Sequence, residues 1–216
     1  MNREPGTMLL EVCIDTPEGL ERALASGARR LEVCSRLDLG GLTPTHSLLD
    51  EALEAARPLA VPVHAMVRSR ANTRYQPDRA EFAELCTDLM RVRAQGAQGA
   101  VFGLLTADGR VDRERTRELV HRARPLSVTF HRAFDQVRDP LAELEVLISL
   151  GVERVLTSGG APTALEGLSV LRQLVRAARG RIGILPGGGV RAHNAQEIAR
   201  ESGALELHGS VPFQAE

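Results

Sequence analysis

Short apolar segments of this sequence carry a polar, chemically reactive side chain at every second position. In residues 8–14, for example, Glu11 and Cys13 alternate with apolar residues. Successive side chains of a β-strand point to opposite faces, so this alternation predicts strands with one apolar and one reactive face. Segments 30–34, 61–68, 126–131 and 204–208 repeat it. The reactive members are Glu11, Cys13, Glu32, Cys34, His64, Met66, Arg68, Thr129, His131, Glu206 and His208.

Acid–base catalysis is the first chemistry that such a set could perform. Burying a charged group without a partner costs several kcal/mol, so these groups must pair with one another, bind a ligand or contact water. Convergent titratable side chains are typical of functional sites. We therefore predict an acid–base site in which His131 and Glu32 act as general acid and base. The complete candidate catalytic set is Glu11, Glu32, His64, His131, Asp135, Glu206 and His208.

Anion binding is the second candidate chemistry, because glycine-rich turns follow two of the predicted strands. Backbone amides at such turns and at helix N-termini form anion sites, and arginine adds a charged fork. Tight turns with no ligand are the alternative interpretation. The predicted ligand is a small anionic or phosphorylated molecule. The candidate anion-binding residues are Arg68, Arg70, Arg132, Ser158, Gly159, Gly187, Gly188 and Gly189.

A Glu-Val-Cys triplet occurs twice and places Cys13 and Cys34 on two strands that should be neighbours. Neighbouring strands lie about 4.8 Å apart, so two inward thiols could bind a soft monovalent metal such as Cu(I), form a disulfide or simply pack. Met66 and His64 are possible additional ligands. Zinc is less favoured, because the histidines show no familiar zinc-ligand spacing.

Eight predicted strands alternate with helical stretches along the chain. The strands cover residues 8–14, 30–34, 61–68, 99–103, 126–131, 154–158, 181–185 and 204–208, and seven helical stretches lie between them, including 44–56, 77–95, 140–150 and 164–178. This pattern predicts a single-domain (β/α)8 barrel of the TIM type over residues 1–216, with the site at the C-terminal ends of the strands. A doubly wound open sheet would usually carry a glycine-rich turn after the first strand, and none is present.

Helix starts and the chain end refine this prediction. Threonine or aspartate followed by proline is typical of a helix start, and this pattern occurs at Thr16-Pro17, Thr43-Pro44 and Asp139-Pro140. Only residues 209–216 follow the last predicted strand, so the eighth covering helix should be short or absent. Either a seam stays open or a second subunit covers it, and we expect a homo-oligomer.

Composition excludes several classes of function. The 216 residues carry a formal net charge of −1, which suggests neither nucleic acid nor an anionic membrane as a partner. Every basic residue is arginine, so a Schiff-base lysine enzyme is excluded. Residues 1–7 are polar, no apolar stretch is long enough to span a membrane, and three cysteines are too few for a disulfide framework. We expect a cytoplasmic protein.

The sequence resembles the CutC copper-homeostasis family along most of its length. The resemblance is carried in order by MLLEVCIDTPEG, RRLEVCSRLDLGGLTP, VPVHAMVRSR, GAVFGLLTADGRVD, LSVTFHRAFDQVRDP, GVERVLTSGG and PGGGVRAHN. It implies a cytoplasmic eight-stranded barrel, usually oligomeric, that binds Cu(I) through Cys13 and Cys34. The chain departs from the family pattern in residues 68–72, where Arg-Ser-Arg-Ala-Asn replaces Arg-Pro-Arg-Gly-Gly, and in its short tail.

Three functions therefore stand side by side. The resemblance favours Cu(I) binding by the paired cysteines, with no other cofactor. The polar interior favours an isomerase or lyase that transfers protons on a small anion, because Cu(I) makes no use of three carboxylates. A barrel that serves only as a binding or scaffold module is the third.

Overall fold

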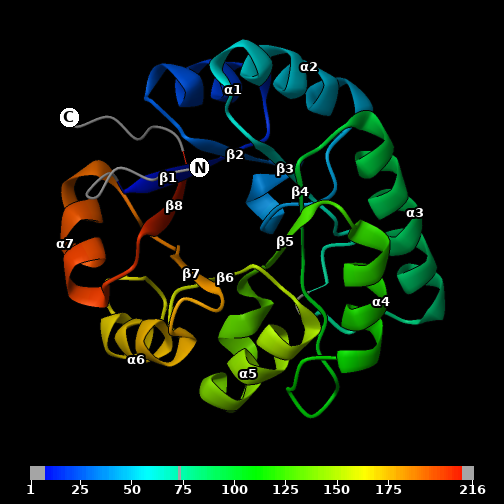
Figure 1. The fold of residues 1–216 in the computed structure, drawn as a ribbon. Coiled ribbons are helices and arrows are strands. Elements are labelled where there is room, and N and C mark those ends of the chain that lie inside the picture. Colours follow the sequence, from blue (N-terminus) through cyan, green and yellow to red (C-terminus); the bar gives the residue numbers. More distant parts are fainter. Residues whose placement is uncertain (1–7, 73, 211–216) are drawn as a thin grey trace.

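A computed structural model describes residues 8–72 and 74–210. Eight parallel strands form one sheet in the order β7-β6-β5-β4-β3-β2-β1-β8. They curl into the nearly closed barrel of Figure 1, which confirms the predicted fold. The strands are β1 (Leu9–Ile14), β2 (Arg30–Val33), β3 (Val63–Met66), β4 (Gly99–Phe102), β5 (Ser127–Phe130), β6 (Arg154–Thr157), β7 (Gly183–Pro186) and β8 (Glu206–Ser210).

Helices surround the barrel and cover the outer face of the sheet (Figure 1). They are α1 (Pro17–Ala25), α2 (His46–Ala56), α3 (Arg79–Gln95), α4 (Arg113–Ala123), α5 (Pro140–Leu150), α6 (Leu168–Ala178) and α7 (Ala192–Ser202). Three short 3-10 helices, η1 (Leu37–Leu39), η2 (Arg57–Leu59) and η3 (Arg132–Gln136), lie in the connections. The expected absence of an eighth helix concerns residues after 210, which lie outside the described part of the chain.

The two ends of the sheet meet at β7 and β8. These strands lie side by side, and within residues 8–72 and 74–210 they share no ladder of paired residues. Every other pair of neighbouring strands is in parallel register, for example Glu11 with Arg30 and Glu32 with His64. The barrel is therefore nearly closed, with its edge between β7 and β8.

The N-cap residues that the sequence predicted are confirmed, with one exception. Thr16 accepts a hydrogen bond from the Gly19 amide at the start of α1, as expected of an N-cap. For α2 the cap is Thr45 rather than the predicted Thr43. The Thr43 hydroxyl is used elsewhere, because it accepts from the Arg68 amide and donates to Asp88.

The side chains of the strands are divided between two faces of the sheet, as predicted. The apolar set packs with the helices in the main core, and the reactive set lies inside the barrel and is almost entirely buried. Leu205 is the exception, since it precedes β8 and is 70% exposed instead of facing a helix. Two glycines make room for imidazoles: a Cβ on Gly99 would lie 2.4 Å from the His64 ring, and one on Gly103 2.4 Å from the His131 ring.

The length and apolar character of a helix decide whether it can cross a membrane. Among the described residues, none of the helices combines the length and the apolar character needed to cross a bilayer.

Candidate functional site

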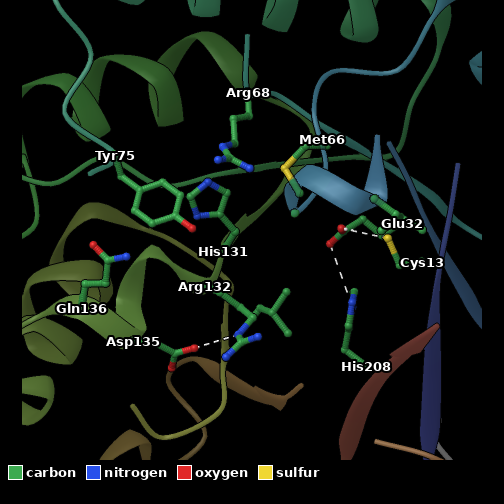
Figure 2. Close-up of a pocket in the computed structure, with 13 residues that line it drawn as sticks. Cys13, Glu32, Met66, Arg68, Tyr75, His131, Arg132, Asp135, Gln136 and His208 are labelled. Atoms are coloured by element: carbon green, nitrogen blue, oxygen red, sulfur yellow. Dashed lines mark hydrogen bonds and ion pairs between the residues drawn. The ribbon is translucent and has the colours of Figure 1, made fainter. Parts of the chain in front are cut away.

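A cavity of about 350 Å³ opens inside the barrel where the strands end (Figure 2). Active sites of parallel barrels sit at this end, as the sequence predicted for this chain. The cavity brings together residues that are far apart in the sequence. Its lining consists of Cys13, Glu32, Leu37, Gly40, Met66, Arg68, Tyr75, His131, Arg132, Asp135, Gln136, Leu156 and His208.

Sulfur atoms form one wall of the cavity. The Sγ atoms of Cys13 and Cys34 lie 3.6 Å apart, and both thiols are free. Met66 belongs to the same buried apolar cluster. Gly41 closes the cluster in a left-handed conformation, and a Cβ there would lie 3.4 Å from the Cys34 Sγ. The predicted cysteine pair is therefore assembled, with a thioether beside it.

A carboxylate and an imidazole adjoin the sulfur atoms. The Cys13 thiol donates to Oε1 of Glu32 at 3.5 Å, and Nδ1 of His208 lies 4.0 Å from Oε2. Oε2 is buried and has no hydrogen-bond partner. Burial raises the pKa of Glu32. The hydrogen bond between Cys13 and Cys34, together with burial, raises the pKa of the Cys13 thiol well above its usual value. Neither group is ionised as readily as in water.

His208 is held by a second carboxylate deeper in the barrel. Its Nδ1 lies 2.7 Å from Oε1 of Glu11, which is fully buried. The Glu32 and Glu11 carboxylates raise the pKa of His208 against the opposing effect of its burial. Arg30 and the His208 hydrogen bond lower the pKa of Glu11, although burial acts in the opposite direction. The buried Glu11 carboxylate therefore holds the His208 ring in place at the base of the cavity.

Two arginines balance the remaining buried charge. Arg30 pairs with Glu11 and also with Glu206 at 2.8 Å, and Arg154 pairs with Glu206 at 3.1 Å. Arg30 is 3% exposed and Glu11 is 0% exposed. Of the predicted catalytic residues, Glu11 and Glu206 thus lie beneath the cavity and within this charged network, not on its lining.

Replacing Arg30 by methionine is expected to lower the free energy of unfolding by about 3 to 5 kcal/mol, because it leaves Glu11 with a buried charge that His208 alone must balance. Urea denaturation of the two proteins measures the difference. Adding Glu11→Gln to Arg30→Met should recover part of the loss. An Arg30→Met protein as stable as the parent would show that the network carries little energy.

His64 and His131 are buried imidazoles without a carboxylate partner among the described residues. Burial lowers the pKa of each to about 3, so both are neutral at physiological pH. His64 lies beneath the cavity, and its Nδ1 has no hydrogen-bond partner. His131 lies on the cavity wall, where its Nδ1 accepts from the Ala133 amide at 3.2 Å. The Nε2 of His131 therefore carries the ring proton.

Arg68 is fixed by backbone oxygens. Its guanidinium donates to the carbonyls of Leu39 and Gly41, each at 3.0 Å, and to that of Asn72 at 3.0 Å. It also lies 5.3 Å from the centre of the Tyr75 ring, a cation–π arrangement. Arg68 is 8% exposed and forms no ion pair with any described carboxylate.

Asp135 organises the loops at the lower edge of Figure 2. It pairs with Arg132 at 2.8 Å and accepts from the amides of Ser158 and Gly160. Ser158 also accepts from Arg132 at 2.9 Å. The anion held by the Ser158 amide in this structure is thus the chain's own carboxylate.

The predicted glycines lie beside the cavity rather than on its lining, and Gly187 and Gly188 pack against the lining residues His208 and Arg132. The amides of Gly159 and Gly187 donate to Thr157, through its hydroxyl and its carbonyl respectively. Gly188 lies against Arg132, since a Cβ there would be 3.3 Å from the guanidinium carbon, and Gly189 lies against Thr163. Arg70 lies outside the cavity lining and forms a half-exposed pair with Glu84.

Arg30, Arg154 and Tyr75 are largely buried or cavity-lining residues that were not among the predicted site residues. Arg30 has the same strand parity as Glu32, so the alternation already placed it inside the barrel. Tyr75 has no such signal, because it follows β3 in a loop and adopts a left-handed φ of 55°. Its ring lies 5.0 Å from that of His131, and only the folded loop brings the two together.

Comparison with known proteins identifies relatives along nearly the whole chain. The model of the CutC family matches residues 8–212. A human protein named copper homeostasis protein cutC homolog is 45% identical over 203 residues, which cover 94% of this chain and 73% of the human protein. A CutC family protein of Vibrio vulnificus strain YJ016 is 48% identical, covering 92% of this chain and 79% of that protein.

Solved structures agree with the fold. CutC from Streptococcus agalactiae superposes with a TM-score of 0.91 at 28% identity, covering 96% of this chain and all of that one (100%). A thiamine phosphate pyrophosphorylase from Pyrococcus furiosus gives a TM-score of 0.64 at 16% identity, covering 94% of this chain and 85% of that one. At that identity the second likeness concerns the barrel alone.

Proposed function

We propose, from the premise that this chain belongs to the CutC family, that it takes part in copper homeostasis by binding Cu(I) through the thiolates of Cys13 and Cys34. The observation that carries the proposal is the 3.6 Å separation of the two Sγ atoms. Thiolates and thioethers are the ligands that select Cu(I). Met66 supplies a thioether in the same buried cluster.

The local environment supports a soft metal ion. The cluster around the two sulfur atoms is apolar, with Met66 and Val101 buried beside them and Leu37 packed on it. These apolar neighbours lie on one side of the sulfur atoms, and soft thiolate and thioether donors favour a soft monovalent ion over a strongly hydrated divalent one. Three cysteines are too few for a disulfide framework, which is typical of proteins in a reducing compartment, and we propose the cytoplasm as the location.

A second donor set overlaps the first. Atoms of Cys13, Glu32 and His208 lie within 4.8 Å of one another, and such a mixed sulfur, oxygen and nitrogen set suits Zn²⁺. We favour Cu(I), because the second thiol, that of Cys34, lies 3.6 Å from Cys13 and adds a soft donor that the mixed set lacks. The two sets share Cys13 and differ in Cys34 and His208, so variants of the latter two separate them.

Anaerobic titration of the reduced protein against a competing chelator tests the proposal. We expect one tight Cu(I) site that persists in His208→Gln and is lost in Cys34→Ser. Parallel titration with Zn²⁺ should show weak binding. The reverse pattern, tight Zn²⁺ binding lost in His208→Gln and kept in Cys34→Ser, would replace the Cu(I) site by the mixed one.

A further inference from the structure

The cavity contains more charge and more polar groups than a copper site uses. One side holds the sulfur atoms, Glu32 and His208, and the other holds Arg68, Tyr75, His131 and Arg132 (Figure 2). Copper binding explains Cys13 and Met66. It gives no role to the second side, which is built from residues that follow β3 and β5.

Positive charge on this second side is incompletely balanced. Arg132 pairs with Asp135, whereas Arg68 is nearly buried and pairs with no described carboxylate. Carbonyl dipoles and the Tyr75 ring offset part of its charge. A buried guanidinium without a counter-charge is costly, so the cavity favours an anion at this side.

His131 adds a neutral donor to the same side. Its Nδ1 is occupied by the Ala133 amide, so its Nε2–H is the group left for another partner. The ring is 5% exposed, and Gly103 lies so close behind it that no larger residue fits there. A ligand oxygen would therefore meet a donor whose orientation is already fixed.

Glu32 supplies an acceptor on the opposite side. Its Oε2 is buried without a hydrogen-bond partner, and the side chain is only 2% exposed. A buried polar atom of this kind costs free energy until it is paired. A hydroxyl group on the ligand would donate to it, and the neighbouring Cys13 thiol already occupies Oε1.

We propose that this cavity binds a small organic anion that carries a hydroxyl group, with the anionic end at Arg68, His131 and Arg132 and the hydroxyl end at Glu32. The volume of about 350 Å³ lies at the lower end of ligand pockets, which span roughly 300 to 1,000 Å³. The site shares a wall with the copper ligands and is independent of copper binding. A carboxylate and a phosphate ester fit this chemistry equally well.

Isothermal titration calorimetry on the reduced, metal-free protein tests the proposal with four probes. Glycerate and glycerol 3-phosphate carry an anion and a hydroxyl, propanoate lacks the hydroxyl, and glycerol lacks the charge. We expect one of the first two to bind, and the tighter one identifies the anionic group. Propanoate and glycerol should each bind at least ~10-fold more weakly, about 1.4 kcal/mol.

Arg132→Gln is the decisive variant. Arg68 is less suitable, because its guanidinium also holds the surrounding loops and replacing it would disturb them. The Arg132 side chain is 41% exposed, so its removal should leave the fold intact. We expect it to weaken binding at least ~10-fold. Arg200→Gln, at the end of α7 and outside the cavity, should bind as the parent does.

The outcomes separate this site from the copper site. Anion binding should survive Cys13→Ser/Cys34→Ser, and Cu(I) binding should survive Arg132→Gln. The proposal is overturned if neither glycerate nor glycerol 3-phosphate binds, if glycerol binds as well as they do, or if Arg132→Gln and Arg200→Gln behave alike.

Discussion

The Cys13→Ser/Cys34→Ser double variant should bind Cu(I) at least ~1,000-fold more weakly than the parent, a loss of about 4 kcal/mol. Serine keeps the size and the hydrogen-bonding capacity of each position, and its oxygen is a poor ligand for a soft ion. Met66 remains in the cluster, and a single thioether is a weaker anchor than two thiolates. Competition with a chelator of known Cu(I) affinity measures the change.

Cys86 provides the matched control for this prediction. It is the third free cysteine, lies on α3 and packs at the edge of the main core rather than at the cavity. Cys86→Ser should therefore leave the Cu(I) affinity unchanged. Circular dichroism shows whether the double variant stays folded. A folded double variant with parental affinity would remove the cysteine pair from the proposed function.

The fold was predictable because the sequence shows two clear periodicities, that of β-strands and that of α-helices. Alternation such as that of residues 8–14 separates an outward apolar face from an inward reactive one, and helical stretches follow each segment. The strand ends were less predictable: residues 61–68 were predicted and β3 covers only Val63–Met66, whereas β7 and β8 end one and two residues later than predicted. Arg68 lies beyond the paired region because its side chain and amide bind the loop after β2.

The site was predictable in membership and less so in arrangement. Strand parity placed Glu32, His131 and His208 inside the barrel, and they line one cavity. Strand parity does not say how deep a side chain lies along the barrel axis. Glu11 and His64 were therefore predicted at the level of Glu32, His131 and His208, whereas they lie beneath the cavity that those residues line. Loop contacts are beyond local sequence patterns altogether. The Ser158 amide binds Asp135 because η3 folds against β6, a contact between residues 23 positions apart.

The proposed metal site and the proposed anion site occupy different parts of the same barrel interior. The sulfur ligands come from β1, the end of β2 and β3, while the groups at the anionic end follow β3 and β5. Glu32 lies between the two, since it accepts from Cys13 through one oxygen while the other has no hydrogen-bond partner. This division explains why a copper site alone leaves much of the polar lining without a role.

Acidification from pH 6.5 to pH 5 should lower the free energy of unfolding by about 3 kcal/mol through His64 and His131. Both have a pKa lowered to about 3 by burial, against about 6.5 in the unfolded chain. Between these values the unfolded chain binds protons that the folded chain does not, so stability falls as the pH falls. Urea denaturation at the two pH values measures the change.

The other buried titratable groups change the free energy of unfolding at other pH values or in the opposite direction. The raised pKa of His208 stabilises the fold at low pH and loses that contribution as the pH rises through its folded value. The lowered pKa of Glu11 adds to acid destabilisation only below its usual range. The raised pKa of Glu32 has the opposite sign and offsets part of the loss.

His64→Met separates the histidine contribution from these others. Methionine fills the space that Gly99 leaves beside the ring and cannot bind a proton, so the loss between pH 6.5 and pH 5 should shrink by about half. His121→Gln, at an exposed position of α4, should retain the full loss. Equal pH dependence in His64→Met and the parent would mean that His64 is protonated in the folded protein. A buried imidazolium there would need a counter-charge, and the acids that act on His64, Glu11 and Glu206, already pair with Arg30.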